Sequence, residues 1–270
     1  MNLIQGRALF ACLATLSPIA LAILCLSAAH ASADPSSRML LFGSSSVRGS
    51  FGRVITEELG RRGISVVRRG YSAAGLARPD YRDLRETLRA LPLEGTTRSV
   101  MLYIGGNDAQ GIWLRPDERQ GTRPSDMWIW WNDERWNSVY VGRAVALIQS
   151  LCARGMQHVI VLPPADVRST RLQSRLERVR NALRRATEAT ECGRFVSTAG
   201  DVRQLETAEL AGEPLRTPDG VHMTTAGALR VWSRVRDTVL ALARSNGRPL
   251  RAQGDSLPNM ITASLTTQQQ

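Results

Sequence analysis

Short apolar runs alternate with amphipathic stretches along the chain after residue 38. The apolar runs are four or five residues long, as expected for strands buried on both faces, and they cover residues 39–42, 64–67, 100–104, 158–162 and, more weakly, 194–197. Between them, apolar residues recur at helical spacing and predict helices over residues 51–62, 81–91, 139–153, 172–190 and 224–243. In the last helix, Leu229, Trp232, Val235 and Val239 are expected to face inward. This alternation predicts a parallel sheet with helices on both faces, an α/β/α sandwich.

Two segments interrupt the alternation. Residues 110–136 form a tryptophan-rich insertion behind the third predicted strand. Residues 245–270 are polar, lack helical periodicity and end in three glutamines, which predicts a disordered tail. The folded domain is therefore expected to span residues 38–244.

The first 33 residues have the features of an export signal. Arg7 precedes an apolar run over residues 8–29, and small residues follow at Ala29, Ala31 and Ala33. We expect cleavage after Ala31 or Ala33 and a periplasmic or secreted protein. The run is long for a cleaved signal, so an uncleaved N-terminal membrane anchor is the alternative.

Two cysteines remain after removal of that signal. Cys152 and Cys192 each lie at the end of a predicted helix just before a strand. An oxidising compartment allows a disulfide to persist, so the two can form a pair; two separate thiols are the alternative.

The basic charge changes this picture little. The formal net charge is +11, and all 35 basic residues are arginines, spread along the chain and often at helical spacing among acidic residues. Such a balance indicates solvated helix faces and non-specific attraction more than a nucleic-acid site. We expect no nucleic-acid partner, although peripheral association with an anionic envelope surface stays open. No cofactor or metal motif is present, and the oligomeric state cannot be read from the sequence.

Three polar segments lie where a parallel sheet places its ligands, at the carboxyl ends of strands. Serines 44–46 follow the first strand, residues 105–108 (Gly-Gly-Asn-Asp) follow the third, and residues 219–222 (Asp-Gly-Val-His) precede the last helix. A carboxylate three residues before a histidine can fix the ring's tautomer and stabilise its charged form, as a base that activates serine requires. Each segment alone is equally a helix cap or a turn. Together, in this order, they predict a serine esterase.

With these motifs the chain resembles the SGNH (GDSL-type) hydrolases, over about residues 39–243. It is most similar to their exported bacterial branch catalogued as a domain of unknown function, which residues 75–81 (Gly-Leu-Ala-Arg-Pro-Asp-Tyr) also fit. The resemblance implies a flavodoxin-like three-layer fold with a five-stranded parallel sheet. It also implies a triad and an oxyanion hole: Ser45 as nucleophile, His222 as base oriented by Asp219, and the Ser45 N–H, Gly75 (or Gly70) and Asn107 as oxyanion donors.

The first block departs from the family pattern. Ser44 stands where the family usually has an aspartate, which leaves the choice among Ser44, Ser45 and Ser46 less secure. With this serine, the first block also resembles the pattern found in related polysaccharide O-acetyltransferases. Residues 254–257 spell Gly-Asp-Ser-Leu, but no strand precedes them, so we expect no role for them.

The insertion carries five tryptophans among several arginines. An aromatic loop beside the site could stack on sugar rings, and Trp113, Trp128 and Trp131 are the candidates for substrate binding. The alternative is that these rings seat the insertion on the domain.

We therefore expect an exported serine esterase that removes acyl groups, acetyl foremost, from a small-molecule, polysaccharide or cell-envelope ester. One alternative is an O-acyltransferase with the same residues. The other is a catalytically weak envelope module that binds a glycan or a protein.

Overall fold

The computed structural model describes residues 38–93, 97–121, 123–200, 209–210 and 212–245. Its central sheet has five parallel strands in the order β2-β1-β3-β6-β7. The strands are β1 (Arg38–Gly43), β2 (Ser65–Gly70), β3 (Thr97–Tyr103), β6 (His158–Leu162) and β7 (Gly193–Phe195). The five-stranded parallel sheet and the α/β fold class predicted from the sequence are confirmed.

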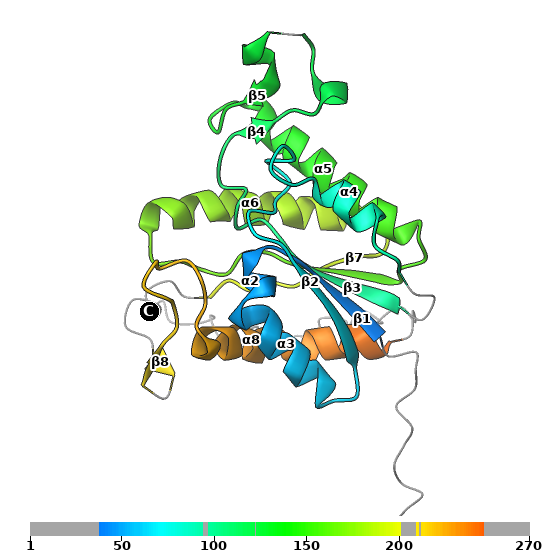
Figure 1. Cartoon of the computed structure of the whole chain (residues 1–270), viewed down its shortest axis with the longest axis vertical. Helices are drawn as coiled ribbons and strands as arrows, with labels where there is room; N and C mark the ends of the chain where they lie inside the picture. The colour runs from blue at the N-terminus through cyan, green and yellow to red at the C-terminus, as the bar shows by residue number, and fades with distance from the viewer. Residues whose placement is uncertain (1–37, 94–96, 122, 201–208, 211, 246–270) are drawn as a thin grey trace, which may run out of the picture.

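Helices cover both faces of the sheet (Figure 1). One layer holds α3 (Ser50–Gly60) and α8 (Thr225–Arg244); the other holds α4 (Leu84–Arg89), α5 (Arg135–Cys152) and α6 (Thr170–Glu188). Successive strand residues point to opposite faces. In β1, Met39 and Leu41 therefore join the core under α3 and α8, while Leu40 and Phe42 join the core under α4, α5 and α6.

Three predicted elements differ from the observed ones. The helix predicted over residues 81–91 is only Leu84–Arg89, because the Asp83 side chain caps it by accepting from the Arg85 N–H at 2.8 Å. The helix α5 begins at Arg135, ahead of the predicted residue 139, because the buried rings of Trp136 and Tyr140 extend its inward face. Leu229 of α8 is exposed, so its predicted inward orientation is wrong.

The insertion forms a small subdomain at the top of Figure 1. Its strands β4 (Ile112–Trp113) and β5 (Trp128–Ile129) pair antiparallel, and between them lie the 3-10 turns η1 (Pro116–Glu118) and η2 (Pro124–Met127). Ile112 and Ile129 are buried in the same core as α4, α5 and α6. The remaining short elements are α2 (Ser45–Arg48), β8 (Glu209–Leu210) and β9 (Glu213–Pro214).

Cys152, the last residue of α5, and Cys192, just before β7, form a disulfide. Of the two alternatives left open by the sequence, a disulfide or two separate thiols, the structure has the disulfide. The predicted export signal, the tail and residues 254–257 lie outside the described residues. Within the described ranges, no helix combines the length and the apolarity needed to cross a bilayer.

Candidate active site

Ser45 reaches the carboxyl edge of the sheet because the chain turns sharply after β1. A Cβ on Gly43 would overlap the carbonyl oxygen of Tyr103, so only glycine allows this approach to β3. The Ser44 N–H donates to the same carbonyl at 3.2 Å, and the Ser44 carbonyl accepts from Val47 at 3.0 Å. Ser44 is thus a buried turn residue, and Ser45 begins α2 with its side chain half-buried.

A tight loop before α8 presents the histidine. Gly220 has a φ of 70°, in the left-handed region that glycine adopts freely. Asp219 Oδ1 accepts from the N–H groups of Val221 and His222 at 2.8 and 2.9 Å and from the Thr217 hydroxyl at 2.7 Å. One carboxylate oxygen therefore organises the loop, and the other remains available to the imidazole.

Three side chains from two distant segments form a linear hydrogen-bonded array. His222 Nδ1 lies 2.6 Å from Asp219 Oδ2, and His222 Nε2 lies 3.0 Å from Ser45 Oγ. An ionised carboxylate can only accept, so Nδ1 carries the proton and Nε2 presents its lone pair to the Ser45 hydroxyl. This is the arrangement in which an imidazole can take a proton from a serine.

The carboxylate of this array stays charged. Its hydrogen bond to His222, followed by those from Thr217 and the backbone N–H groups, holds the pKa of Asp219 far below its usual range. A fixed negative charge beside Nδ1 stabilises the imidazolium that forms when Nε2 accepts a proton.

A cavity of about 70 Å³, the triad pocket, lies beside this array. Ser45, His222 and Asn107 all line it, so the structure brings these three predicted residues together. The rest of its wall is largely apolar and includes Pro164, Ala165, Val167, Leu172, Leu176 and Val221.

Asn107 is held in place through the loop that follows β2. Its Nδ2 donates to the Ala74 carbonyl at 2.9 Å, which uses one of the two amide hydrogens. The preceding residue, Ala73, has a φ of 54°, the only positive value at a non-glycine in the described ranges. Backbone strain of this kind persists where surrounding contacts over-determine a loop, often at functional sites.

The two candidate glycines do not line the triad pocket. Gly75 packs against Asp108, and a Cβ there would overlap the carboxylate. Gly70 ends β2, and a Cβ there would overlap the backbone of Arg48 in α2. Both glycines thus permit close backbone packing around the site. Gly75 adjoins the pocket through Ala74, the residue that accepts from Asn107.

Asp108, the residue after Asn107, has a structural role. It is fully buried; Oδ1 accepts from the Ala77 N–H and Oδ2 from the Tyr140 hydroxyl, both at 2.8 Å. Burial raises the pKa of Asp108 despite these hydrogen bonds. The carboxyl group ties the 75–77 loop to α5, and nothing near it in the sequence signals that contact.

Sequence reasoning missed Arg216, which lines the triad pocket. It is buried, its Nη1 donates to the Val221 carbonyl at 2.7 Å, and its Nη2 donates to the Asp166 carbonyl. Burial lowers the pKa of Arg216. Arg216 therefore anchors the backbone beside His222. As one arginine among many, it carries no distinguishing signal in the sequence.

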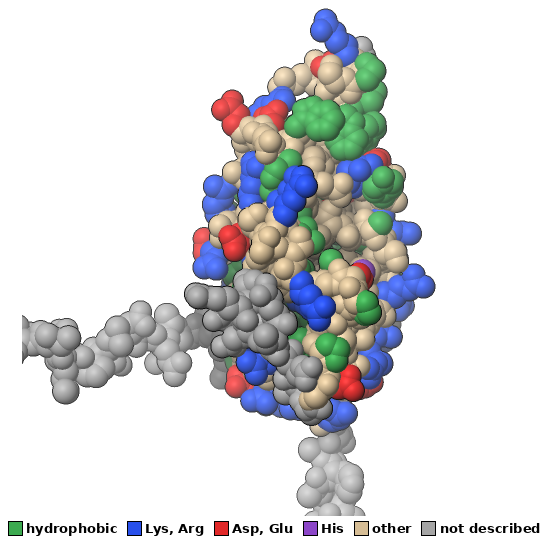
Figure 2. All heavy atoms as spheres, turned by 90° about the vertical axis from the view of Figure 1, so that its left-hand side faces the viewer, with side chains coloured by type: hydrophobic (Ala, Val, Ile, Leu, Met, Phe, Trp, Pro, Cys, Tyr) green, Lys and Arg blue, Asp and Glu red, His purple; other side chains and the backbone are tan. Residues whose placement is uncertain are grey.

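The tryptophans of the insertion divide into two groups. Trp131 packs edge-on against Trp136 at 4.7 Å with the Arg178 guanidinium over its ring, so it seats the insertion on α5 and α6. Trp113, Trp128 and Trp130 form an outer group: Trp128 packs edge-on to Trp113 at 5.0 Å and stacks with Trp130 at 5.9 Å. Trp130, not among the predicted candidates, is 69% exposed. Figure 2 shows hydrophobic side chains gathered near the top, where the insertion lies, with basic side chains scattered below.

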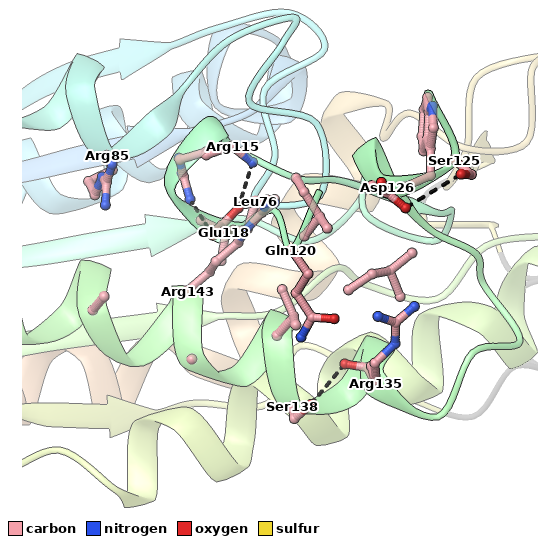
Figure 3. A pocket seen from close by; sticks show the side chains of 16 residues that line it. Leu76, Arg85, Arg115, Glu118, Gln120, Ser125, Asp126, Arg135, Ser138 and Arg143 are labelled. Carbon is pink, nitrogen blue, oxygen red and sulfur yellow. Dashed lines mark hydrogen bonds and ion pairs between the residues drawn. The ribbon is translucent and has the colours of Figure 1, made fainter. Parts of the chain in front are cut away.

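A second, larger cavity lies on the insertion. It has a volume of about 440 Å³ and lies between the outer surface of α5 and residues 114–120 and 125–129 of the insertion (Figure 3). We call it the insertion cavity. Its walls contain no serine–histidine pair, whereas the smaller triad pocket does. An aligned serine–histidine pair is better evidence for an active site than a large cavity volume, so we place the candidate chemistry in the triad pocket.

The parallel sheet with polar side chains at its carboxyl edge is the flavodoxin-like architecture of the SGNH-type hydrolases. Residues 38–238 match the family model described as "Protein of unknown function (DUF459)", and the chain belongs to this family. No curated protein matches the chain.

Solved structures with this fold include esterases. An acetylxylan esterase from Geobacillus stearothermophilus, Axe2, in a catalytic mutant, is 15% identical, with 74% of this chain and 93% of that chain covered and a TM-score of 0.53. LAE5, an alpha/beta hydrolase enzyme from the metagenome of Lake Arreo, is 18% identical, with 77% and 94% covered and a TM-score of 0.50. At such identities the likeness establishes the shared fold.

Proposed function

We propose that the protein is a serine esterase of the SGNH type, with Ser45 as nucleophile, His222 as general base and Asp219 as its partner. The observation that carries the proposal is the array Ser45 Oγ–His222 Nε2–His222 Nδ1–Asp219 Oδ2, with spacings of 3.0 and 2.6 Å. The fold shared with Axe2 and LAE5 supports the same assignment.

The reaction proceeds in two stages. His222 Nε2 takes the Ser45 proton as Oγ attacks the acyl carbonyl carbon, and the resulting oxyanion is stabilised by hydrogen-bond donors. These donors are the Ser45 N–H, which has no partner within α2 because Ser45 is the first residue of that helix, and the second amide hydrogen of Asn107; Gly75 remains a candidate through its N–H. The alcohol leaves with the proton from His222. Water, deprotonated by His222, then releases the acyl group from Ser45.

The acyl group is short. A cavity of about 70 Å³ has room for only a handful of heavy atoms, and its wall formed by Val167, Leu172 and Leu176 is apolar. Acetyl fits such a space. The exposed ring of Trp130, stacked on Trp128, supports a carbohydrate as the other part of the ester, because aromatic faces pack against the C–H faces of sugars.

Labelling with a fluorophosphonate tests the nucleophile. The mature protein should be modified at Ser45, and the label should be absent from His222→Ala. Modification at Ser44, Ser46 or Ser256, or no modification at all, contradicts the assignment.

An O-acyltransferase is the second candidate, favoured by Ser44 in place of the family's aspartate. The acyl-Ser45 intermediate would then react with a sugar hydroxyl rather than with water. Product analysis with an acetyl donor and a glycan acceptor separates transfer from hydrolysis. A weakly catalytic glycan-binding module is the third candidate, and it requires that Ser45→Ala leave the cellular phenotype intact.

We propose export to the periplasm or the medium, which the disulfide between Cys152 and Cys192 supports, since disulfides persist in oxidising compartments. Sequencing of the mature N-terminus should find cleavage after Ala31 or Ala33. An intact N-terminus in a membrane fraction would favour the anchor instead.

A further inference from the structure

The insertion cavity has the size of a ligand site. Its volume of about 440 Å³ lies within the roughly 300–1,000 Å³ of small-molecule sites, whereas the triad pocket has about 70 Å³. It is open along the surface of α5 and lined by both polar and apolar side chains (Figure 3).

The inner wall is rigid and nearly neutral. Arg143 Nε donates to Glu118 at 2.9 Å, and Arg115 pairs with Glu118 at 3.2 Å and with Asp83 at 2.7 Å. Two guanidinium groups are thus matched by two carboxylates. Arg85 and Arg135 also line the cavity, and they pair with Glu86 at 3.5 Å and with Asp133 at 2.7 Å. A phosphate or a nucleotide would need uncompensated positive charge, which this wall does not offer.

The outer part of the cavity holds the charged Arg135 and Asp126 together with uncharged hydrogen-bonding groups, and Asp126 accepts from the Arg123 N–H at 3.0 Å. Gln120 extends into the cavity, and in the described part of the chain no protein group hydrogen-bonds to its amide (Figure 3). Ser125 and Ser138 add hydroxyl groups at the rim. The floor is apolar, with Leu114, Ile129 and Val139, and Trp128 adds an aromatic ring.

A polyhydroxylated ring meets both kinds of surface. Its hydroxyl groups match the amide and hydroxyl side chains, and its C–H faces match the aromatic and aliphatic side chains. A purely apolar ligand would instead take the amide and hydroxyl side chains out of water without giving them a hydrogen-bond partner, at a cost.

One loop connects this cavity to the triad pocket. Leu76 lines the insertion cavity, and its carbonyl accepts from Arg143 Nη1 at 2.6 Å. Two residues earlier, Ala74 accepts from Asn107. Two residues span at most about 7 Å, so the Leu76 carbonyl at the insertion cavity and the Ala74 carbonyl that holds Asn107, a residue of the triad pocket, lie on one short segment. A glycan several residues long exceeds this length, whereas a small ester does not.

We propose that the insertion cavity is a non-catalytic subsite for uncharged sugar residues of the glycan whose ester is cleaved at Ser45. The link to catalysis rests on the proposed esterase function; binding of sugar in the cavity does not.

Gly142 provides a way to close the cavity without disturbing the fold. It lies within α5 and lines the cavity, and a Cβ added there meets no atom within 4 Å. Gly142→Phe therefore fills the cavity from an open position, and replacing a glycine inside a helix favours the helix. Gly60→Phe is the matched control, because Gly60 also lies in a helix, its added Cβ also meets nothing, and it lines neither cavity.

Calorimetric titration of the Ser45→Ala protein with xylopentaose, cellopentaose and chitopentaose measures binding in the absence of turnover. At least one of the three should bind. Its affinity should fall about tenfold or more in Gly142→Phe, fall about threefold in Gln120→Ala, and stay within about twofold in Gly60→Phe. Melting temperatures of all variants verify folding.

Two results with the oligosaccharides overturn the proposal: none of the three binds, or Gly142→Phe binds as tightly as Gly60→Phe. Competition by inorganic phosphate would also overturn it. Hydrolysis of p-nitrophenyl acetate by the unmodified protein separates the two proposals. Oligosaccharide binding without hydrolysis refutes the esterase function but supports the sugar subsite. Ser45-dependent hydrolysis without oligosaccharide binding supports the esterase function but refutes the sugar subsite.

Discussion

The triad pocket and the insertion cavity differ in almost every physical respect. The pocket is small, and His222, which lines it, is about half exposed and held with its partner Asp219 by a tight loop. The cavity is larger, and its inner wall contains Arg143, whose side chain is only 4% exposed, in a network of ion pairs.

The difference separates catalysis from binding. A covalent step depends on a few atoms held within hydrogen-bonding distance of one another. Binding depends on area and on fixed polar groups. Buried ion pairs are costly unless fully matched, and the matched network around Glu118 keeps the cavity's shape. The size of a cavity therefore does not locate the chemistry in this protein.

The largest expected effect comes from removing the nucleophile. Ser45→Ala should lower kcat on p-nitrophenyl acetate by about 10⁴-fold or more, because no other group can form the acyl intermediate. Ser46→Ala, in the same turn of α2, is the control and should change kcat by no more than about threefold. Substantial activity remaining in Ser45→Ala would contradict the assignment of catalysis to the triad pocket, since the reaction would then take place elsewhere in the protein.

Asp219→Asn should lower kcat by about 10³-fold, because the amide can neither fix the imidazole tautomer nor stabilise the imidazolium. The lowered pKa of Asp219 means that its stabilising interactions exist above about pH 4, the range of its unfolded value, and are lost only as pH falls through the lower folded value. Loss of activity between pH 5 and 7 is therefore not caused by Asp219. The exposed Asp237→Asn is the control; an equal effect there would contradict the assignment.

Removing the disulfide tests whether the stability of the fold can be lowered without a loss of activity at the triad pocket. The bond joins positions 40 residues apart, and in the chain-entropy account its loss in Cys152→Ala/Cys192→Ala should lower the free energy of unfolding by about 4 kcal/mol. Urea denaturation measures this. Activity at 25 °C should persist, because the bond joins the end of α5 to the start of β7, at the edge of the sheet opposite Ser45. A tenfold fall in kcat in the folded variant would show that the disulfide also positions the triad.

The smallest effect concerns the outer tryptophans. Trp130→Ala should raise KM for an acetylated polysaccharide about fivefold and leave hydrolysis of p-nitrophenyl acetate unchanged, because loss of one exposed stacking ring costs about 1 kcal/mol. Trp131→Ala should instead lower the melting temperature, because that ring packs against Trp136. An unchanged KM for the acetylated polysaccharide would show that Trp130 does not contribute to its binding.

The order of elements and the candidate triad could be predicted because both depend on short stretches of sequence. A strand reveals itself by a few consecutive apolar residues, and the Asp219–His222 contact spans only three positions. The convergence of Ser45, Asn107 and His222 followed from topology, since the carboxyl ends of parallel strands share one edge.

Other features depend on contacts between distant residues that no local pattern encodes. Trp130 and Trp131 are adjacent and chemically identical, yet one is exposed and the other packs against α5. Arg216 and Asp108 acquire their roles from carbonyl, amide and hydroxyl groups far along the chain. The Cys152–Cys192 bond likewise depended on where the end of α5 meets the segment just before β7.

The amino-acid sequence alone determined the layered fold and the choice of candidate reacting groups, because periodicity and short motifs act between near neighbours. Only the tertiary structure decided which tryptophan faces solvent, which buried charges are matched and where a second cavity opens. These outcomes arise from packing between distant segments, which decides which of several residues of the same type is buried or paired.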